Sequence, residues 1–303
     1  MAVAFPALAQ NELSAKAWLV NMSQALHEKQ FKTSLIHLQA DHFSPLVYLH
    51  GKVDGKEVAF LEYLNGPPKN AVRVNDSVTF IEHDQPAYSV AANRIQGGWP
   101  QLLAGNFDNY EKGYEFVLGG RSRIAGRSAQ MVRIIPRDES RYSHQVWVDM
   151  DTYLPLRYDL LTENKQLIEQ LMAVELLLLP DTPPLLKEIV TQTWPPMIKT
   201  SGRAQGKNWH FTWLPLGFHV TSRDQHQLMG NQQPVEYISL TDGLVNISVY
   251  VARAGGAPLP EELMTRNGLS LVTEKVGSAE VVAMGKIPVN TLRKIATGLT
   301  LEQ

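Results

Sequence analysis

Residues 121–170 constrain the fold most, because they hold three β-prone segments in a row with short turns between them. The segments are Gln130–Ile135, Tyr142–Val148 and Tyr153–Leu161, and branched apolar or aromatic residues recur in each. Parallel strands need long crossover connections, whereas antiparallel neighbours can be joined by a few residues. The spacing therefore predicts an antiparallel meander. The stretch has no nucleophile–base pair and no metal-ligand spacing, so it indicates a sheet scaffold rather than an enzyme.

Short β-prone segments also fill the rest of the first 180 residues. We expect further strands at Lys32–Gln39, Pro45–Lys52, Lys56–Leu64, Ala71–Val74, Ser77–Glu82, Ala87–Ala91, Tyr114–Leu118 and Gln166–Leu178. Asp54-Gly55 is a hairpin signal between two of them. About ten short strands with tight turns predict a large, strongly curved antiparallel sheet or partial barrel.

Two helices are predicted in the same region. The first runs over Asn11–Lys29, with Asn11 as its cap and an apolar face at helical spacing. That face consists of Trp18, Met22, Ala25 and Leu26. We expect it to lie over the domain's own core, on the concave side of the sheet. The second helix is short and is predicted over Gly98–Gly105.

A proline-rich segment at residues 181–206 is interpreted as a linker, with a short helix over Leu185–Thr191. The length of 303 residues also exceeds one typical domain. We therefore expect an N-terminal half-barrel domain over 10–180 and a small α+β domain over 207–303. In the smaller domain we expect strands at His219–Arg223, Val235–Leu240, Leu244–Arg253, Leu269–Lys275 and Glu280–Lys286, and a helix over Asn290–Gly298 opened by Pro288.

Residues 1–9 resemble the tail of a secretory signal. Ala7-Leu8-Ala9 has the small-x-small pattern of a cleavage site. An alanine-rich terminus without a targeting role is the alternative, and the sequence leaves both open. The longest apolar run, Leu171–Leu179, falls well short of the ~20 residues that cross a bilayer.

Composition excludes several functional classes. The chain has 28 basic and 30 acidic residues and a formal charge of −2, which argues against a nucleic-acid partner. It has no cysteine, so disulfides and cysteine-ligated metals are excluded. The nine histidines show no H-x-H or H-E-x-x-H spacing, and we expect no metal and no cofactor.

Two further motifs fail on inspection. Asp149–Asp151 begins like a calcium loop, but Pro155 and Leu156 follow where glycine and oxygen ligands are needed, so a β-turn is favoured. Gly126–Gln130 departs from G-x-S-x-G at its last position. We predict that the protein is not an enzyme.

An arginine-rich pattern remains, in which lysine is absent and the positions are Arg121, Arg123, Arg127, Arg133, Arg137 and Arg141. The guanidinium fork suits bidentate binding of phosphate or carboxylate. One interpretation is an anion-binding face, with Arg121, Arg123, Arg127 and Arg133 as candidate ligands of an anionic lipid. The other is internal pairing with acidic residues on neighbouring strands, namely Asp149, Asp151, Asp159 or Glu163. A nearby aromatic segment is interpreted as core, with the mouth of a lipid cavity as the alternative; it comprises Trp99, Phe107, Tyr110, Tyr114 and Phe116.

Several motifs together resemble the RseB/MucB family. They are R-x-A-G-R, I-P-R-D-x-x-R-Y, V-W-x-D-x-D-T-x-L-P-L and E-Q within residues 123–170, W-L-P-L-G-F at residues 213–218, and D-G-L at residues 242–244 followed by I-S-V at 247–249. The matches cover most of the chain in the family's order. Where some members carry a cysteine, this chain has Ala129, so a thiol-based role is excluded.

The resemblance implies a periplasmic protein that pairs a lipoprotein-carrier-like half-barrel with a small C-terminal domain. It implies binding to the periplasmic segment of a membrane-spanning anti-sigma factor, which protects that factor from regulated proteolysis and restrains the envelope-stress response. It also implies release by lipopolysaccharide or lipid, and contact with the inner membrane only through the partner. A periplasmic lipoprotein or lipid carrier is the alternative function, and a homo-oligomer is left open.

Overall fold

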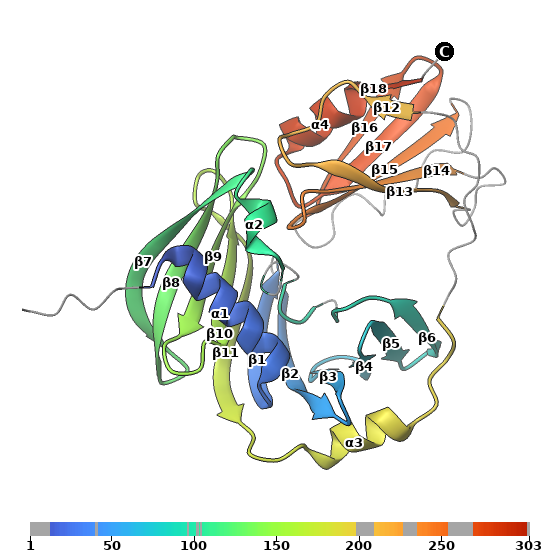
Figure 1. Ribbon diagram of the computed structural model, residues 1–303. Coiled ribbons are helices and arrows are strands. Elements are labelled where there is room, and N and C mark those ends of the chain that lie inside the picture. The colour runs from blue at the N-terminus through green and yellow to red at the C-terminus, as the bar shows by residue number, and fades with distance from the viewer. Residues whose placement is uncertain are drawn as a thin grey trace, which may run out of the picture.

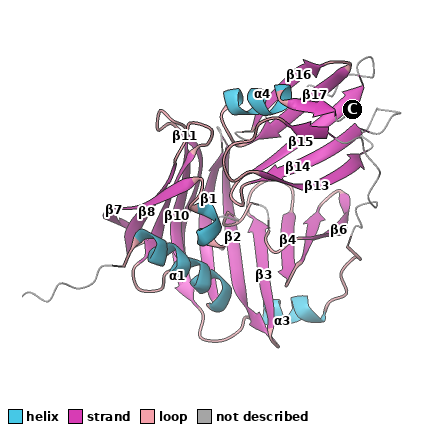
Figure 2. Cartoon of the chain, turned by 45° about the horizontal axis from the view of Figure 1, so that its top comes forward, coloured by secondary structure: helices cyan, strands magenta, loops and turns pink. Residues whose placement is uncertain are grey.

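The computed structural model describes residues 13–39, 42–95, 97–100, 103, 105–197, 209–226, 235–253 and 269–301. A large curved sheet is crossed by one helix, and a smaller sheet with its own helix lies at one end of it (Figure 1). Turning the molecule shows the strands of the large sheet standing side by side below the smaller sheet (Figure 2).

The large sheet has 11 strands in the order β6-β5-β4-β3-β2-β1-β11-β10-β9-β8-β7. Its strands are β1 (Phe31–Gln39), β2 (His42–Val53), β3 (Lys56–Tyr63), β4 (Lys69–Val74), β5 (Ser77–Glu82), β6 (Gln85–Ala91), β7 (Tyr114–Ile124), β8 (Arg127–Pro136), β9 (Ser143–Asp149), β10 (Pro155–Leu161) and β11 (Leu167–Leu178). The meander predicted from residues 121–170 is confirmed, because β8 pairs with β9 and β9 with β10, both antiparallel. The predicted curved, open antiparallel sheet is confirmed as well.

The centre of this sheet is a seam between its first and last strands. β1 pairs antiparallel with β2 on one side and with β11 on the other. Two meanders therefore run outward from the seam, one through β2–β6 and the other through β10–β7. Short turns suffice within each meander, and the seam alone joins distant parts of the chain.

Helix α1 (Ala15–Glu28) lies across the concave side of the sheet (Figure 1). The four residues predicted for its apolar face are all buried, at most 8% exposed. Its start was predicted wrongly, since the cap is Ser14, whose side chain accepts a hydrogen bond from Ala17 N at 3.1 Å. Asn11, the predicted cap, lies outside the described residues. Asn11 and Ser14 both carry a side-chain oxygen that can cap a helix, so residue type alone did not decide which of them is the cap.

Of the helix predicted over Gly98–Gly105, the described residues show no α-helix and only a 3-10 turn, in which Leu103 N donates to the Pro100 carbonyl at 3.0 Å. The short helix α2 (Phe107–Tyr110) begins after it, where the Asn106 side chain accepts from Asp108 N at 3.0 Å. Glycines and a proline in the predicted range disfavour a helix there. Helix α3 (Pro184–Thr191), predicted to within one residue, packs on a separate apolar cluster of β2, β3 and β4.

The smaller sheet has the order β13-β14-β15-β17-β16, and a two-stranded sheet pairs β12 with β18. The elements are β12 (Trp209–Phe211), β13 (His219–His226), β14 (Val235–Thr241), β15 (Asn246–Arg253), β16 (Ser270–Val276), β17 (Ala279–Gly285), α4 (Val289–Thr297) and β18 (Leu299–Leu301). Helix α4 follows Pro288 as predicted, and it packs on β16 and β17. The predicted linker is described only up to residue 197. In the described part of the chain, no helix is long and apolar enough to span a bilayer.

Candidate functional site

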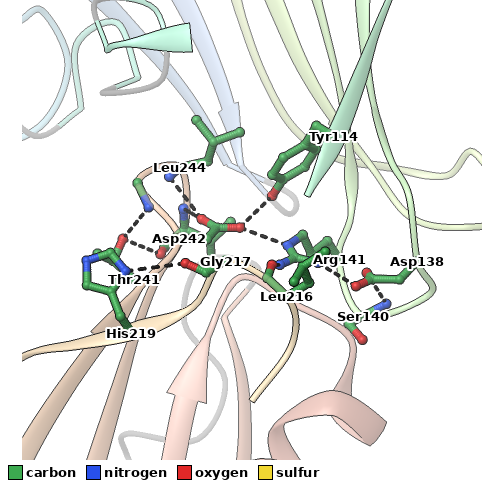
Figure 3. Close-up of polar contacts among 12 residues, drawn as sticks. Tyr114, Asp138, Ser140, Arg141, Leu216, Gly217, His219, Thr241, Asp242 and Leu244 are labelled. Carbon is green, nitrogen blue, oxygen red and sulfur yellow. Dashed lines mark hydrogen bonds and ion pairs between the residues drawn. The ribbon is translucent and has the colours of Figure 1, made fainter. Parts of the chain in front are cut away.

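Three motifs that lie far apart in the sequence meet where the smaller sheet contacts the large one (Figure 3). The D-x-x-R of residues 138–141 lies between β8 and β9. The end of W-L-P-L-G-F, residues 216–218, precedes β13, and the D-G-L turn of residues 242–244 follows β14. We call this contact the junction.

Arg141 is the central cation of the junction, and its side chain has no exposed surface. Its Nε donates to Asp242 Oδ2 at 2.8 Å and its Nη1 to Asp138 Oδ2 at 2.6 Å, while Nη2 donates to the Leu216 carbonyl. The guanidinium also lies over the ring of Phe218, 5.0 Å from its centroid. One side chain of the large sheet thus binds both segments of the smaller one.

Asp242 is the matching anion, and only 3% of its side chain is exposed. Besides Arg141, its Oδ2 accepts from the Tyr114 hydroxyl at 3.1 Å. Its Oδ1 accepts from the backbone N–H groups of Leu244 and Val245, each at 2.9 Å. Asp242 therefore fixes its own turn and the contact between the sheets with the same carboxylate.

The rest of the D-G-L turn fits closely against the large sheet. Gly243 has φ +93°, and a Cβ at that position would lie 2.5 Å from the Tyr110 ring. The Tyr110 hydroxyl donates to the Gly243 carbonyl at 3.3 Å. Leu244 packs against the apolar cores of both sheets. Glycine is required here for its positive φ and for the missing side chain.

A second ion pair joins the sheets. Lys286 Nζ lies 2.6 Å from Glu169 Oε2, and His37 Nε2 lies 2.8 Å from Glu169 Oε1. Burial acts to raise the pKa of Glu169, but the hydrogen bond from His37 and the charge of Lys286 outweigh it and lower the pKa to about 2. Glu169 thus stays ionised at neutral pH and holds the lysine of the smaller sheet.

The charged and polar side chains of the junction bind one another across the two sheets. Burial and the neighbouring Asp242 charge raise the pKa of Tyr114 well above its usual value, so its hydroxyl remains a hydrogen-bond donor. Burial opposes the charge of Arg141, but its bonds to Asp242 and Asp138 raise the pKa of the guanidinium. Among the described residues, no group of three or more His, Asp or Glu side chains is arranged to hold a metal ion.

The four arginines predicted as lipid ligands lie on the edge strand β7 and its neighbour β8. Residues paired directly across two strands point to the same face, and consecutive residues point to opposite faces. Arg123 pairs with Ser128, so it lies on the face opposite to Arg127. By the same alternation Arg121 belongs with Arg123, and Arg133 with Arg127. The sheet therefore divides the four into two pairs.

These arginines also differ in their partners. Arg127 Nη2 lies 2.8 Å from Oδ2 of the fully buried Asp149, which is the internal pairing considered as the alternative. Arg121 donates to the Gln130 side chain and Arg123 to the Gly126 carbonyl. No salt bridge is found for Arg133 among the described residues. Asp149 also accepts from Thr152 N at 3.1 Å, so Asp149–Asp151 is the β-turn that the sequence favoured.

The aromatic segment is core, as interpreted. Trp99, Phe107, Tyr110 and Tyr114 are at most 5% exposed, and Phe116 packs against them. The sequence alone did not identify the junction, because Arg141 and Asp242 lie 101 positions apart. Their motifs were visible separately, and only the fold brings them together.

Comparison with known proteins gives a consistent result over the whole chain. The family model for the MucB/RseB N-terminal domain matches residues 14–198, and that for the MucB/RseB C-terminal domain matches residues 203–300. Sigma-E factor regulatory protein RseB of Salmonella typhimurium is 30% identical, over 97% of this chain and 93% of its own. The protein of the same name from Haemophilus influenzae is 29% identical, over 94% and 90%. Sigma factor AlgU regulatory protein MucB of Pseudomonas aeruginosa is 26% identical, over 95% and 91%.

Solved structures agree in fold. The chain aligns with the complex structure of Pseudomonas aeruginosa MucA/MucB at a TM-score of 0.75 and 24% identity, covering 95% of this chain and 99% of that one. It aligns with MucB in complex with MucA(peri) at a TM-score of 0.74 and 25% identity, with the same coverage.

Proposed function

This chain belongs to the MucB/RseB family, and we propose that it is a periplasmic regulator that binds the periplasmic segment of a membrane-spanning anti-sigma factor. Bound there, it would protect that segment from regulated proteolysis and so restrain the envelope-stress response. The observation that carries the proposal is the match over both parts of the chain, including the motifs that form the junction. A carrier that needs only the curved sheet would not explain the second sheet and its docking contacts.

The partner can be tested directly by calorimetry. The purified full chain is expected to bind a peptide spanning the anti-sigma periplasmic segment and to leave a scrambled peptide unbound. A chain ending at Gly202 is expected to lose most of this binding, since we propose that the smaller domain is essential. No binding by the full chain would contradict the proposed function. Full-strength binding by the shortened chain would contradict only the role of the smaller domain.

Release by an anionic lipid such as lipopolysaccharide remains part of the proposal, with Arg121, Arg123, Arg127 and Arg133 as candidate headgroup ligands. Arg121 and Arg123 lie on one face of the sheet and Arg127 and Arg133 on the other, so substitutions can test the two pairs separately. Replacing Arg121 and Arg123 with Gln is expected to weaken lipopolysaccharide binding by about 1–3 kcal/mol per lost charge-assisted contact. Anti-sigma binding should stay near wild type if the lipid site and the anti-sigma site are distinct.

Arg127→Gln serves as the matched control for this experiment. It removes the partner of a buried carboxylate, so it is expected to lower the free energy of unfolding by roughly 2–3 kcal/mol. Arg127→Gln should weaken lipopolysaccharide binding less than the Arg121/Arg123 double substitution does. If the Arg121/Arg123 double variant instead melts at lower temperature with unchanged lipid affinity, these arginines are structural and the lipid site lies elsewhere.

A further inference from the structure

The two edge strands of the large sheet, β7 and β6, differ in how they are protected. An unprotected edge strand can pair with another chain, and proteins block such edges with charged side chains, prolines and bulges. β7 carries Arg121 and Arg123, and its pairing is irregular after Leu118. The sequence of β6, QPAYSVA, has no charged residue, and its Pro86 and its irregular pairing both lie at the start of the strand. The rest of β6 is therefore an ordinary, unblocked edge.

The second half of β6 turns backbone groups away from the sheet. Ala92 N donates to the Asp76 carbonyl at 2.9 Å, so the backbone of Ala92 faces β5. Because the direction of the backbone groups alternates along a strand, Ser89 and Ala91 turn their N–H and C=O groups to the outer edge. Among the described residues, the pairing recorded at that edge is a single parallel bridge between Ser89 and Met197.

The chain's own segment beside this edge is held weakly. Residues 194–197 run past β6 on the way from α3 to the smaller sheet (Figure 1). Trp194 anchors the segment, because its Nε1 donates to the Ile189 carbonyl at 3.0 Å and its ring packs on the apolar cluster under α3. Pro195 and Pro196 follow, and without an N–H group they cannot donate to a strand ladder. The edge thus accepts an extended chain, but this segment uses little of its hydrogen-bonding capacity.

The side chains of β6 suit an extended apolar partner. Tyr88 and Val90 are half-buried on the face of the main core, where the Phe80 and Tyr88 rings stack with centroids 5.3 Å apart. On the other face Ser89 is fully buried, and its Oγ lies 2.8 Å from Thr79 Oγ1. Neighbouring strands stabilise each other through such side-chain pairs on one face. A strand added here would place alternate side chains beside Tyr88 and Val90.

We propose that an extended segment of the anti-sigma partner adds to the β6 edge as a further strand, in place of residues 195–197, and pairs with the outward backbone groups of Ser89 and Ala91. The inference rests on the proposed function and specifies where the partner binds. Strand addition takes its affinity from backbone hydrogen bonds and its specificity from alternate side chains. The segment should therefore carry apolar residues at alternate positions. β6 lies below the smaller sheet in both views, so a partner on β6 can also reach that sheet (Figures 1 and 2).

The experiment uses the full chain and a peptide spanning the anti-sigma periplasmic segment. Ala91→Pro removes an outward N–H group and leaves the bonds to β5, which alternate residues make. Thr273→Pro is the matched control on an edge strand of the smaller sheet. Val276 and Ala279 flank a two-residue turn and face each other, so the exposed Thr273, three residues back from Val276, faces the outer edge of β16.

In calorimetry we expect Ala91→Pro to bind the peptide about tenfold more weakly than the wild type, because one backbone hydrogen bond is lost. Thr273→Pro should bind as the wild type does. Hydrogen–deuterium exchange should show that residues 85–92 gain protection when the peptide binds, and that β7 does not. Circular dichroism of each variant verifies that it is folded.

The outcomes separate this inference from the proposed function. Wild-type affinity in Ala91→Pro, or peptide binding without protection of residues 85–92, would overturn the docking strand and leave the proposed function in place. No binding by the wild type would overturn both. If Ala91→Pro does not fold, Pro196→Ala tests the same edge, because the added N–H group should hold residues 195–197 on β6 more tightly and weaken peptide binding several-fold. Unchanged affinity in Pro196→Ala, with no protection of β6 in the wild type, would also overturn the docking strand.

Discussion

Arg141 illustrates what a buried charge contributes at a single residue. Removing two ions from water costs several kcal/mol each, and their attraction offsets this only with good geometry and further hydrogen bonds. Arg141 and Asp242 have both, since each also bonds Asp138, Tyr114 or the backbone. The pair adds little net stability by this argument. Any other docking of the sheets would leave two charges buried and unpaired, so the pair selects one orientation.

His144 makes stability depend on pH. It is buried, its Nδ1 lies 2.9 Å from the Tyr158 hydroxyl, and burial lowers its pKa from 6.5 to about 4. The unfolded chain therefore binds a proton below pH 6.5 that the folded chain does not take up until about pH 4. Folding stability is full above pH 6.5 and falls with pH through this window. We expect a loss of roughly 2 kcal/mol between pH 7 and pH 5 from this group.

Urea unfolding of the wild type and of His144→Gln at both pH values measures this loss. The variant is less stable at neutral pH, but its stability should change less between the two pH values, because the titrating group is gone. Most carboxylates titrate below pH 5, so they contribute little to the change in stability between the two pH values. An equally steep loss in the variant would assign the pH dependence to other groups.

The D-G-L turn docks the smaller sheet on the large one. Its fit can be tested by comparing the stability lost on substituting Gly243 with that lost on substituting Gly277. Gly243→Ala places a Cβ 2.5 Å from the Tyr110 ring at φ +93°, whereas Gly277→Ala meets no atom within 4 Å at φ +61°. Both substitutions strain the backbone by about 1–2 kcal/mol. Only the first also overpacks the junction, which adds roughly 1–3 kcal/mol. Equal losses in urea unfolding would show that the turn is not tightly docked.

Most elements could be predicted from the sequence because their signals are local. Alternation and turn residues placed β5 at its observed bounds, Ser77–Glu82, and Pro288 marked the start of α4. The three-residue strands β12 and β18 were missed, since they pair across most of the smaller domain and carry no periodic pattern of their own. Of the helix predicted over Gly98–Gly105, the described residues show only a 3-10 turn at Leu103, in a range where two glycines and a proline disfavour an α-helix.

The site was less predictable than the fold. The sequence showed arginine-rich strands but not their register, and register decides which face each arginine occupies. It also showed the D-x-x-R and D-G-L motifs without any sign that Arg141 and Asp242 are partners. Long-range pairs depend on the topology, which the local pattern does not determine.

At the scale of the whole molecule, the sequence predicts that the two domains can be separated. Pro195-Pro196 and residues 200–206 carry few apolar side chains, so limited proteolysis is expected to cut first between about Met197 and Lys207. Mass spectrometry of the first products would locate the cut. A first cut inside Val117–Leu178 would show that the domain boundary is misplaced.

The junction predicts what happens after that cut. The two fragments of the wild type are expected to co-elute in size-exclusion chromatography, because Arg141 and Asp242 remain buried together. Asp242→Ala leaves the buried Arg141 with only the partly exposed Asp138 as a carboxylate partner, which costs about 3 kcal/mol. The nicked variant should therefore separate into two fragments. Co-elution of the nicked variant would mean that the apolar contacts of Leu244 hold the sheets without the ion pair.

The seam between β1 and β11 has a consequence for how the protein folds. Thr33 and Glu175 are hydrogen-bonded across it, although they lie 142 positions apart. Hairpins within each meander close small loops and form quickly. Pairing β1 with β11 instead costs the entropy of closing a very long loop before any contact across the seam is made. During synthesis, β1 emerges long before β11, so one edge of β1 stays unpaired until β11 is made. We therefore expect pairing across the seam to be the slow step of folding, and the interval before it to be the one in which the chain is most exposed to aggregation.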